Sequence, residues 1–261
     1  MNNLRYKKPL FWAALLGMSC VFSCNERINV VEKPISKKLP VDITKVMDKH
    51  GGVPAWKAMK SMSYEIKRGE INEIQKIDLI TRKELIEAPN FTTGHDGEKV
   101  WLKADTTYNG NAVFYHNLMF YFIAMPFVLS DDGINYGDRE PLSFEGIEYP
   151  GIRISYGDSI GYSPEDEYYI HYNPDTYQME WLGYTVTYFS KEKSKDIHWI
   201  RYNDWGIVNG LILPNSLDWY RYKDGLPTEF RNKLILENMT ISAEEYEDSI
   251  FDIIEDAEFI E

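Results

Sequence analysis

An uncharged, strongly apolar segment at residues 112–129 (AVFYHNLMFYFIAMPFVL) constrains the fold of this chain more than any other feature. Asp, Glu, Lys and Arg are absent from position 106 to position 130, whereas the flanking sequence is rich in charge. Turn-forming compositions bracket the segment on both sides. Its Leu, Met, Phe and Ala content predicts a helix that is apolar nearly all round, and such a helix must be buried in protein or in membrane.

Three residues decide between these two environments. A membrane-spanning helix needs roughly 20 predominantly apolar residues, and His116, Asn117 and Pro126 interrupt this segment. We therefore expect a hydrophobic helix that packs over a β-sheet and is broken or kinked near Pro126. Membrane insertion stays open as the alternative.

The first 23 residues have the composition of a secretory signal. Basic residues between positions 5 and 8 precede a short apolar stretch at residues 10–22. The stretch ends in residues 21–24 (VFSC), which resemble the lipobox of bacterial lipoproteins. The resemblance implies cleavage before Cys24 and lipidation of that cysteine. The alternative is an ordinary secretory signal in which Cys20 and Cys24 have no role.

Lipidation at Cys24 would determine both the redox chemistry and the location of the mature protein. No second cysteine would remain, so an intramolecular disulfide is excluded. Acyl chains would anchor the protein without a spanning helix, because each buried methylene contributes ~0.8 kcal/mol. Residues 24–40 contain two prolines and no apolar periodicity, so we interpret them as a lipidated tether. Asn25, in the place where an aspartate would resemble an inner-membrane retention signal, favours the outer membrane, on its periplasmic face or at the cell surface.

Charge and composition limit the classes of partner. The formal net charge is −13, which argues against nucleic acid and against broad electrostatic binding to anionic lipid. Aromatic residues make up 15% of the chain and are mostly tyrosine, which suits half-buried sheet faces. We expect a single β-rich domain over residues 41–261.

Alternating apolar residues and turn signatures predict an antiparallel meander in the second half of the chain. The expected turns are residues 173–176 (NPDT), 209–210 (NG) and 224–225 (DG). Residues 130–150, rich in Gly and Asp, are expected to form a loop. The acidic residues 243–261 are expected to form either a docked amphipathic helix or a partly disordered end.

Several short motifs resemble the LolA/LolB-like superfamily of lipoprotein-localisation factors. They are residues 168–176 (YYIHYNPDT), 202–205 (YNDW), 208–214 (VNGLILP), 217–220 (LDWY) and 223–225 (KDG). His50-Gly51-Gly52 with Trp56, and Asp96-Gly97 before Trp101, resemble an uncharacterised group of bacterial lipoproteins with this fold. The resemblance implies a mainly β (α+β) fold, in which a strongly curved antiparallel sheet forms an unclosed half-barrel and helices cover its concave face. In the carriers of this superfamily, the apolar space between sheet and helices holds acyl chains.

The sequence favours binding over catalysis. It contains no His-x-x-x-His or Cys-x-x-Cys pair, and no catalytic residue, metal or cofactor is predicted. Four acidic or amide residues between positions 131 and 138 could offer oxygen ligands to calcium, but they lack the spacing of an EF-hand. A solvated loop is the simpler interpretation.

The expected function is that of a lipid-anchored envelope lipoprotein that binds an acyl chain, a lipid or a lipoprotein. The residues expected to line its cavity are Phe114, Met119, Phe120, Phe122, Met125, Phe127 and Trp101. One alternative is a surface lipoprotein that binds glycan or protein through strands rich in Tyr and Trp, with no apolar cavity. The aromatic residues considered for that role are Trp181, Trp199, Trp205 and Trp219. Another alternative is a hydrolase whose catalytic residues are not recognisable in the sequence. A structure separates the first two, because only the first requires an empty apolar cavity beside residues 112–129.

Overall fold

A single antiparallel sheet of thirteen strands organises the computed structural model, which describes residues 39–68, 71–105, 107–156, 163 and 165–260. The predicted signal, Cys24 and all but the last two residues of the predicted tether lie outside the described residues. The strand order is β15-β5-β4-β3-β2-β1-β14-β13-β10-β9-β8-β7-β6. Chain neighbours are therefore sheet neighbours almost everywhere, which is the pattern of a meander.

The first group of strands comprises β1 (Ser61–Arg68), β2 (Ile71–Asp78), β3 (Glu84–Ala88), β4 (Phe91–His95) and β5 (Val100–Ala104). The second comprises β6 (Ile134–Phe144), β7 (Ile147–Tyr156), β8 (Glu167–Tyr172), β9 (Met179–Tyr184), β10 (His198–Arg201), β13 (Ser216–Lys223) and β14 (Leu226–Ser242). The long β14 pairs with β13 on one side and with β1 on the other, and so joins the two groups. A separate hairpin is formed by β11 (Trp205–Val208) and β12 (Leu211–Pro214).

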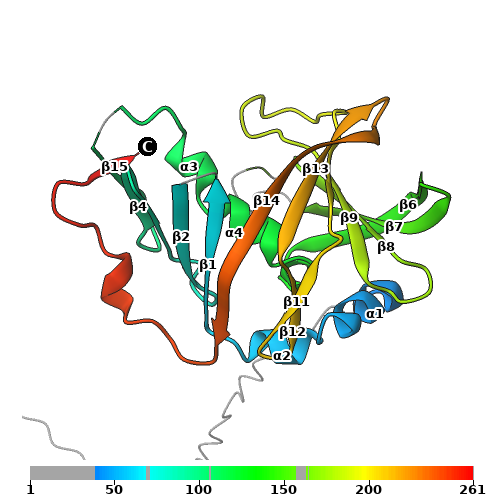
Figure 1. Ribbon diagram of the computed structural model, residues 1–261, viewed down its shortest axis with the longest axis horizontal. Helices are drawn as coiled ribbons and strands as arrows, with labels where there is room; N and C mark the ends of the chain where they lie inside the picture. Colours follow the sequence, from blue (N-terminus) through cyan, green and yellow to red (C-terminus); the bar gives the residue numbers. More distant parts are fainter. Residues whose placement is uncertain (1–38, 69–70, 106, 157–162, 164, 261) are drawn as a thin grey trace, which may run out of the picture. The chain divides into compact units, whose positions relative to one another are not determined.

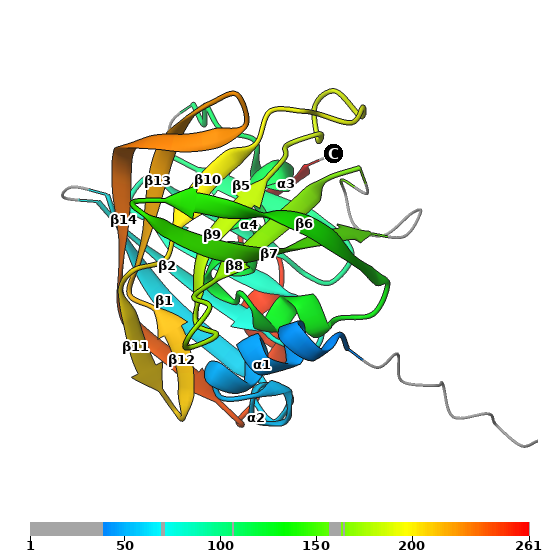
Figure 2. The same cartoon turned by 90° about the vertical axis from the view of Figure 1, so that its right-hand side faces the viewer.

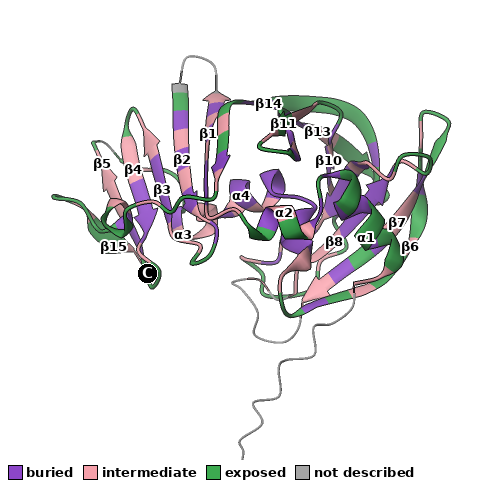
Figure 3. Cartoon of the chain, turned by 90° about the horizontal axis from the view of Figure 1, so that it is seen from below, coloured by how far each residue is buried: buried purple, intermediate pink, exposed green. Residues whose placement is uncertain are grey.

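The sheet curves around a central helical segment without closing (Figures 1 and 2). Its edges are β6 and β15 (Glu258–Ile260), which do not pair with each other. The helical elements are α1 (Val41–Lys49), α2 (Val53–Lys57), α3 (Ala112–Tyr115), α4 (Leu118–Ile123), and the 3-10 turns η1 (Phe127–Ser130) and η2 (Asp248–Phe251). The view from below shows α4 with buried residues between the two groups of strands (Figure 3). The predicted mainly β, unclosed half-barrel with helices on its concave side is confirmed.

The central apolar segment is three short helical pieces, and the single helix expected over residues 112–129 was wrong. A break near Pro126 was predicted, and the chain breaks there between α4 and η1. The unpredicted break is at Asn117, whose φ of 57° is left-handed. Glu84 Oε2 accepts the Asn117 backbone N–H at 2.9 Å, and Asn117 Nδ2 donates to the Arg82 carbonyl at 3.2 Å. Asparagine tolerates this conformation better than most residues, so polar bonds from the sheet interrupt the helix.

The segment therefore does not form a single long helix. No helix among the described residues is long and apolar enough to cross a membrane. Most residues of α4 and η1 are nevertheless buried, whereas α3 buries only Ala112 and is otherwise half-buried. Trp56 of α2 packs on Phe127 of η1, with ring centroids 5.0 Å apart, so α2 is anchored onto the central segment.

Two further expectations were wrong. Residues 130–150, expected as a loop, contain the edge strand β6, which pairs with β7 alone. Most of its side chains are exposed, so its sequence lacks the apolar alternation of a half-buried strand. The acidic tail forms neither a long helix nor a disordered end. Phe251 of η2 packs against Trp101. Strand β15 pairs with β5 at the edge of the sheet, with Phe259 opposite Trp101.

Candidate hydrophobic ligand site

The residues predicted to line a cavity separate into three groups. Five of them, from α4 to η1, are in the main core and at most 4% exposed: Met119, Phe120, Phe122, Met125 and Phe127. Phe114 of α3 is partly exposed and lines a cavity. Trp101 is elsewhere. It is fully buried in a separate cluster with Leu85 and Phe251, and its indole Nε1 donates to the Phe251 carbonyl at 3.0 Å.

A cavity of about 330 Å³ lies beside α3 and α4. Its helical wall is formed by Val113 and Phe114 of α3 and by Leu118 and Tyr121 of α4. A cavity of this size falls at the lower end of the range for small-molecule sites. It occurs where the four-residue α3 and the six-residue α4 meet the curved sheet, which is the place that the sequence indicated.

The opposite wall is aromatic. Tyr156, at the end of β7, and Tyr168 of β8 have ring centroids 5.8 Å apart and planes at 86°. Tyr188, which follows β9, closes another side and has its ring centroid 5.0 Å from that of Phe114. Burial raises the pKa of Tyr121, Tyr156 and Tyr168, so these phenols are neutral at physiological pH.

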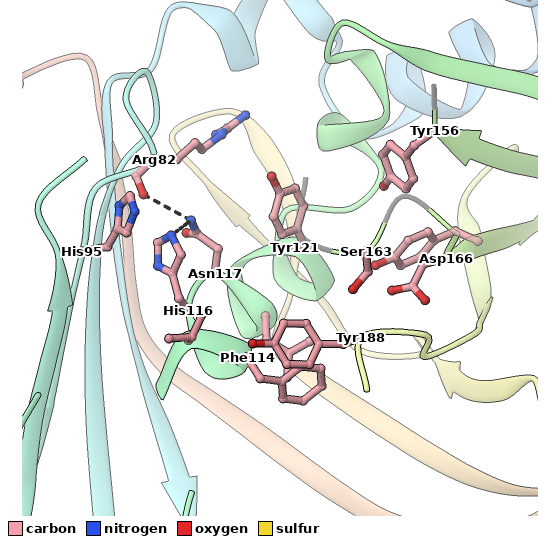
Figure 4. A pocket seen from close by; sticks show the side chains of 13 residues that line it. Arg82, His95, Phe114, His116, Asn117, Tyr121, Tyr156, Ser163, Asp166 and Tyr188 are labelled. Atoms are coloured by element: carbon pink, nitrogen blue, oxygen red, sulfur yellow. Dashed lines mark hydrogen bonds between the residues drawn. The ribbon is translucent and has the colours of Figure 1, made fainter. Parts of the chain in front are cut away.

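One end of the cavity is polar and built around Glu84 of β3. Its Oε2 accepts from the Asn117 backbone and lies 3.0 Å from His116 Nδ1. His116 Nε2 in turn lies 2.8 Å from Asn117 Nδ2. In this arrangement Nδ1 donates to the carboxylate and Nε2 accepts from the amide. The histidine therefore has both ring nitrogens engaged, which is the arrangement of a structural residue rather than a free general base. Figure 4 shows the bond between Asn117 and His116.

His95 of β4 stacks on His116 with ring centroids 4.1 Å apart. Burial, with a smaller effect from His116, lowers the pKa of His95 to about 4, so its ring is neutral at physiological pH. Arg82 also lines this end of the cavity. Its Nη2 lies 2.8 Å from Asp131 Oδ2, and its guanidinium lies 4.9 Å from the centroid of the Phe120 ring.

The other end of the cavity contains Ser163 and Asp166. Both the backbone N–H and the hydroxyl of Thr187 donate to Asp166 Oδ1, at 2.7 and 2.8 Å. Burial nevertheless raises the pKa of Asp166. Figure 4 shows Arg82 and His95 at one side of the cavity and Asp166 and Tyr156 at the other, with Tyr121 between them.

A second hollow of about 390 Å³ lies on the other flank of the helices. It is bounded by Met119 and Phe122 of α4, both predicted to line a cavity, and by Tyr184 of β9 and Trp219 of β13. Phe114 and Leu118 line both this hollow and the first cavity. The contact between helices and sheet is therefore loose on both sides of the α3–α4 junction.

A buried hydrogen-bond network links α3 to the neighbouring strands β1 and β2. Tyr64 donates to Gln75 Oε1, and Gln75 Nε2 donates to Glu73, each at 2.5 Å. The hydroxyl of Tyr115 in α3 also donates to Glu73, at 2.6 Å. The network ties the helix to β1 and β2 through groups that would be costly to leave unpaired.

The polar residues of the site were not predicted from the sequence. Glu84, His95 and Asp166 come from separate strands and loops, and no spacing along the chain links them. The one available indication was the pair His116-Asn117 inside an otherwise apolar segment. No group of three or more His, Cys, Asp or Glu residues that could hold a metal ion occurs in the described part of the chain.

The tryptophans considered for glycan binding do not form an exposed platform. Trp181 and Trp199 are 0% and 1% exposed, inside a cluster on the other side of the sheet from α4. Trp205 and Trp219 are half-buried against the main core. Sugar stacking needs accessible ring faces, and these four side chains offer little of them.

Comparisons with known proteins give structural neighbours only. No protein-family model matches the chain. A search of curated proteins finds no relative. Several solved structures are similar to it at low sequence identity.

A DUF1329 family protein from Desulfovibrio piger is 11% identical, with 81% of this chain and 97% of that chain covered and a TM-score of 0.46. A LolA superfamily protein from Nitrosomonas europaea is 9% identical, with 82% and 99% covered and a TM-score of 0.48. A putative outer membrane lipoprotein-sorting protein domain from Vibrio parahaemolyticus is 9% identical, with 70% and 84% covered and a TM-score of 0.41.

Proposed function

We propose that this chain is a lipid-anchored protein of the bacterial cell envelope that binds a hydrophobic or amphiphilic ligand beside α3 and α4. The observation that carries the proposal is the cavity of about 330 Å³ at the place where an uncharged helical segment meets the concave side of the sheet. A solid junction between helices and sheet would instead favour a purely structural role for the segment.

The walls of the cavity suit an apolar ligand with one polar group. Phe114, Leu118 and the tyrosine rings provide apolar surface, while the ends contain His95 and Asp166. Sites for small molecules combine apolar walls with a few placed polar groups in this way. We propose binding rather than catalysis, because both nitrogens of His116 are engaged in the Glu84–His116–Asn117 arrangement.

The anchor and the location rest on the sequence alone. Cys24 at the end of residues 21–24 is proposed as the site of lipid attachment, and residues 24–40 as the tether. The attached lipid would place the domain at a membrane surface, where hydrophobic ligands are available. The outer membrane is the proposed location, and a lipid or a lipoprotein is the proposed class of ligand.

Filling the cavity tests this function. Leu118 is the residue to change, because it lines both hollows and is the first residue of α4. We expect Leu118→Trp to weaken binding of the neutral fluorescent probe N-phenyl-1-naphthylamine at least tenfold. The matched control is Ile207→Trp, which adds the same side chain at a position that is 78% exposed.

The readout is saturable probe fluorescence, with thermal unfolding as a check that both variants are folded. Unchanged binding by the control, together with a loss in Leu118→Trp, supports the proposal. No saturable binding by the natural sequence, or equal binding by both variants, would overturn it.

A further inference from the structure

Three tyrosine hydroxyls at the cavity have no hydrogen-bond partner among the described residues. Tyr121, Tyr156 and Tyr168 all line it, and each is more than half buried. None of the three oxygens is among the fully buried, unpartnered polar atoms of the described residues, so each is accessible to a ligand in the cavity. The perpendicular rings of Tyr156 and Tyr168 also form two walls of an aromatic corner.

An anionic group lies beside this corner. Asp166 receives two hydrogen bonds from Thr187, and both go to the same carboxylate oxygen, Oδ1. Within the described parts of the chain, its second oxygen accepts no hydrogen bond and no basic group forms an ion pair with it. Lys191 has the smallest effect of the groups that shift the pKa of Asp166, and burial outweighs it.

At the other end of the cavity, the positively charged side chain among the described residues, Arg82, already has a partner. The guanidinium of Arg82 is paired with Asp131 at 2.8 Å, and His95 is neutral at physiological pH because its pKa is about 4. Figure 4 places both residues on the opposite side of Tyr121 from Asp166. The Asp166 end therefore combines one negative charge, aromatic rings and unpaired hydroxyl oxygens.

We infer that the ligand of this cavity carries an organic ammonium group, held between the tyrosine rings and Asp166, with its alkyl part along Phe114 and Leu118. Aromatic faces attract cations, a carboxylate pairs with them, and phenolic oxygens accept hydrogen bonds from N–H groups. A fatty acid would instead place its carboxylate against Asp166, and like charges in a partly buried site repel. The inference rests on the proposed function and narrows it to a class of ligand.

The test compares three amphiphiles with the same ten-carbon chain: decylammonium, decanol and decanoate. Each is titrated calorimetrically into the full chain at pH 7 and 0.15 M salt, below its micelle concentration. We expect decylammonium to bind at least tenfold more tightly than decanol, and decanoate to bind most weakly.

Two variants locate the effect. Asp166→Asn keeps an oxygen for Thr187 and removes the charge, so the preference for decylammonium over decanol should fall at least fivefold. Tyr156→Phe keeps the ring and removes one hydroxyl, so it should weaken the binding of decylammonium severalfold and leave the binding of decanol unchanged. Glu165→Gln is the matched control, because it removes an equal charge one residue away at a side chain that is 42% exposed.

The outcomes separate the two proposals. Equal binding of decylammonium and decanol, or an unchanged preference in Asp166→Asn, overturns the ammonium inference and leaves a hydrophobic site. An equal loss of preference in Glu165→Gln would also overturn it, because general attraction to an acidic protein would then explain the result. Absence of binding by all three amphiphiles would count against the proposed function itself.

Discussion

Trp56 lies flat against Phe127, with ring centroids 5.0 Å apart and planes 5° from parallel. The first residue belongs to α2 and the second to η1, so one stacked pair joins the N-terminal helices to the central apolar segment. Trp56 is also stacked 6.5 Å from Phe120 of α4. Trp56 therefore contacts both α4 and η1 on the concave side of the sheet.

Removing this side chain should be strongly destabilising. We expect Trp56→Ala to lower the free energy of unfolding by about 3–5 kcal/mol, through lost burial and a residual cavity. Chemical denaturation measures the change. Ile207→Ala, at an exposed position, should change it by less than about 0.5 kcal/mol. A small effect at Trp56 would mean that α2 is not needed to hold the central segment.

Phe120 and Phe114 should differ, although both were predicted to line the ligand site. Phe120 is fully buried in the core, so Phe120→Ala should cost about 3–5 kcal/mol of stability. Phe114 is partly exposed and borders both hollows, so Phe114→Ala should cost much less stability and weaken binding of N-phenyl-1-naphthylamine. Denaturation and probe titration on both variants check this. A reversed pattern would mean that the cavity does not hold the probe.

His50 should make stability depend on pH. Its Nδ1 donates to the Ile212 carbonyl at 3.0 Å, and its Nε2 accepts from the Met179 N–H at 3.2 Å, so the neutral ring bridges two strands. Burial, with a smaller effect from the charge of Lys49, lowers the pKa of His50 to about 4. Phe127 and Trp205 are its aromatic neighbours.

Since an unfolded histidine has a pKa of roughly 6.5, the unfolded state takes up more protons between pH 6.5 and 4. The contribution of His50 is therefore complete above pH 6.5 and is lost as the pH falls to 4, by up to about 3 kcal/mol. His50→Gln removes this titration and should lessen the pH dependence of the unfolding free energy over that window, although His95, with a pKa of about 4 as well, keeps its own share. Parallel curves for the two proteins would contradict the prediction.

Lipidation can be tested directly at the two cysteines. Cys24→Ser should release the protein from the membrane, whereas Cys20→Ser should leave it attached, because only Cys24 follows the lipobox-like residues 21–23. Fractionation and intact-mass analysis of the mature protein give the readout. If the mature protein were cleaved at another position and carried no acyl groups, the proposed lipid anchor would be wrong.

Much of the fold could be predicted because turn chemistry is local. Asn209-Gly210 turns β11 into β12, and Asp224-Gly225 turns β13 into β14, as their sequences indicated. The left-handed Asn117 and the edge strand β6 could not be predicted from local patterns. The first depends on Glu84 and Arg82 from a distant hairpin, and the second pairs through its backbone while its side chains remain largely exposed.

Of the residues predicted to line the candidate site, only Phe114 lines the cavity beside α3 and α4, and its polar residues were not predicted. The apolar segment marked where helices would meet the sheet, and Phe114 lines the cavity found there. Trp101 was misplaced because alternation along β5 does not reveal which face of the sheet is concave. Phe251, more than a hundred residues later, covers it on the other face.

The position of β14 has a consequence for the order in which the chain can fold. Ser61 pairs with Ser242, so the strands nearest the start of the domain join the rest of the sheet only through one of the last strands. The hairpins from β1 to β5 can form early, but they have no neighbour until residues 226–242 arrive. Pairings so distant along the chain are slow to form and leave strand edges open meanwhile. A chain that emerges from a translocation channel N-terminus first would thus have two unjoined half-sheets, in need of protection from aggregation, until its final strands emerge.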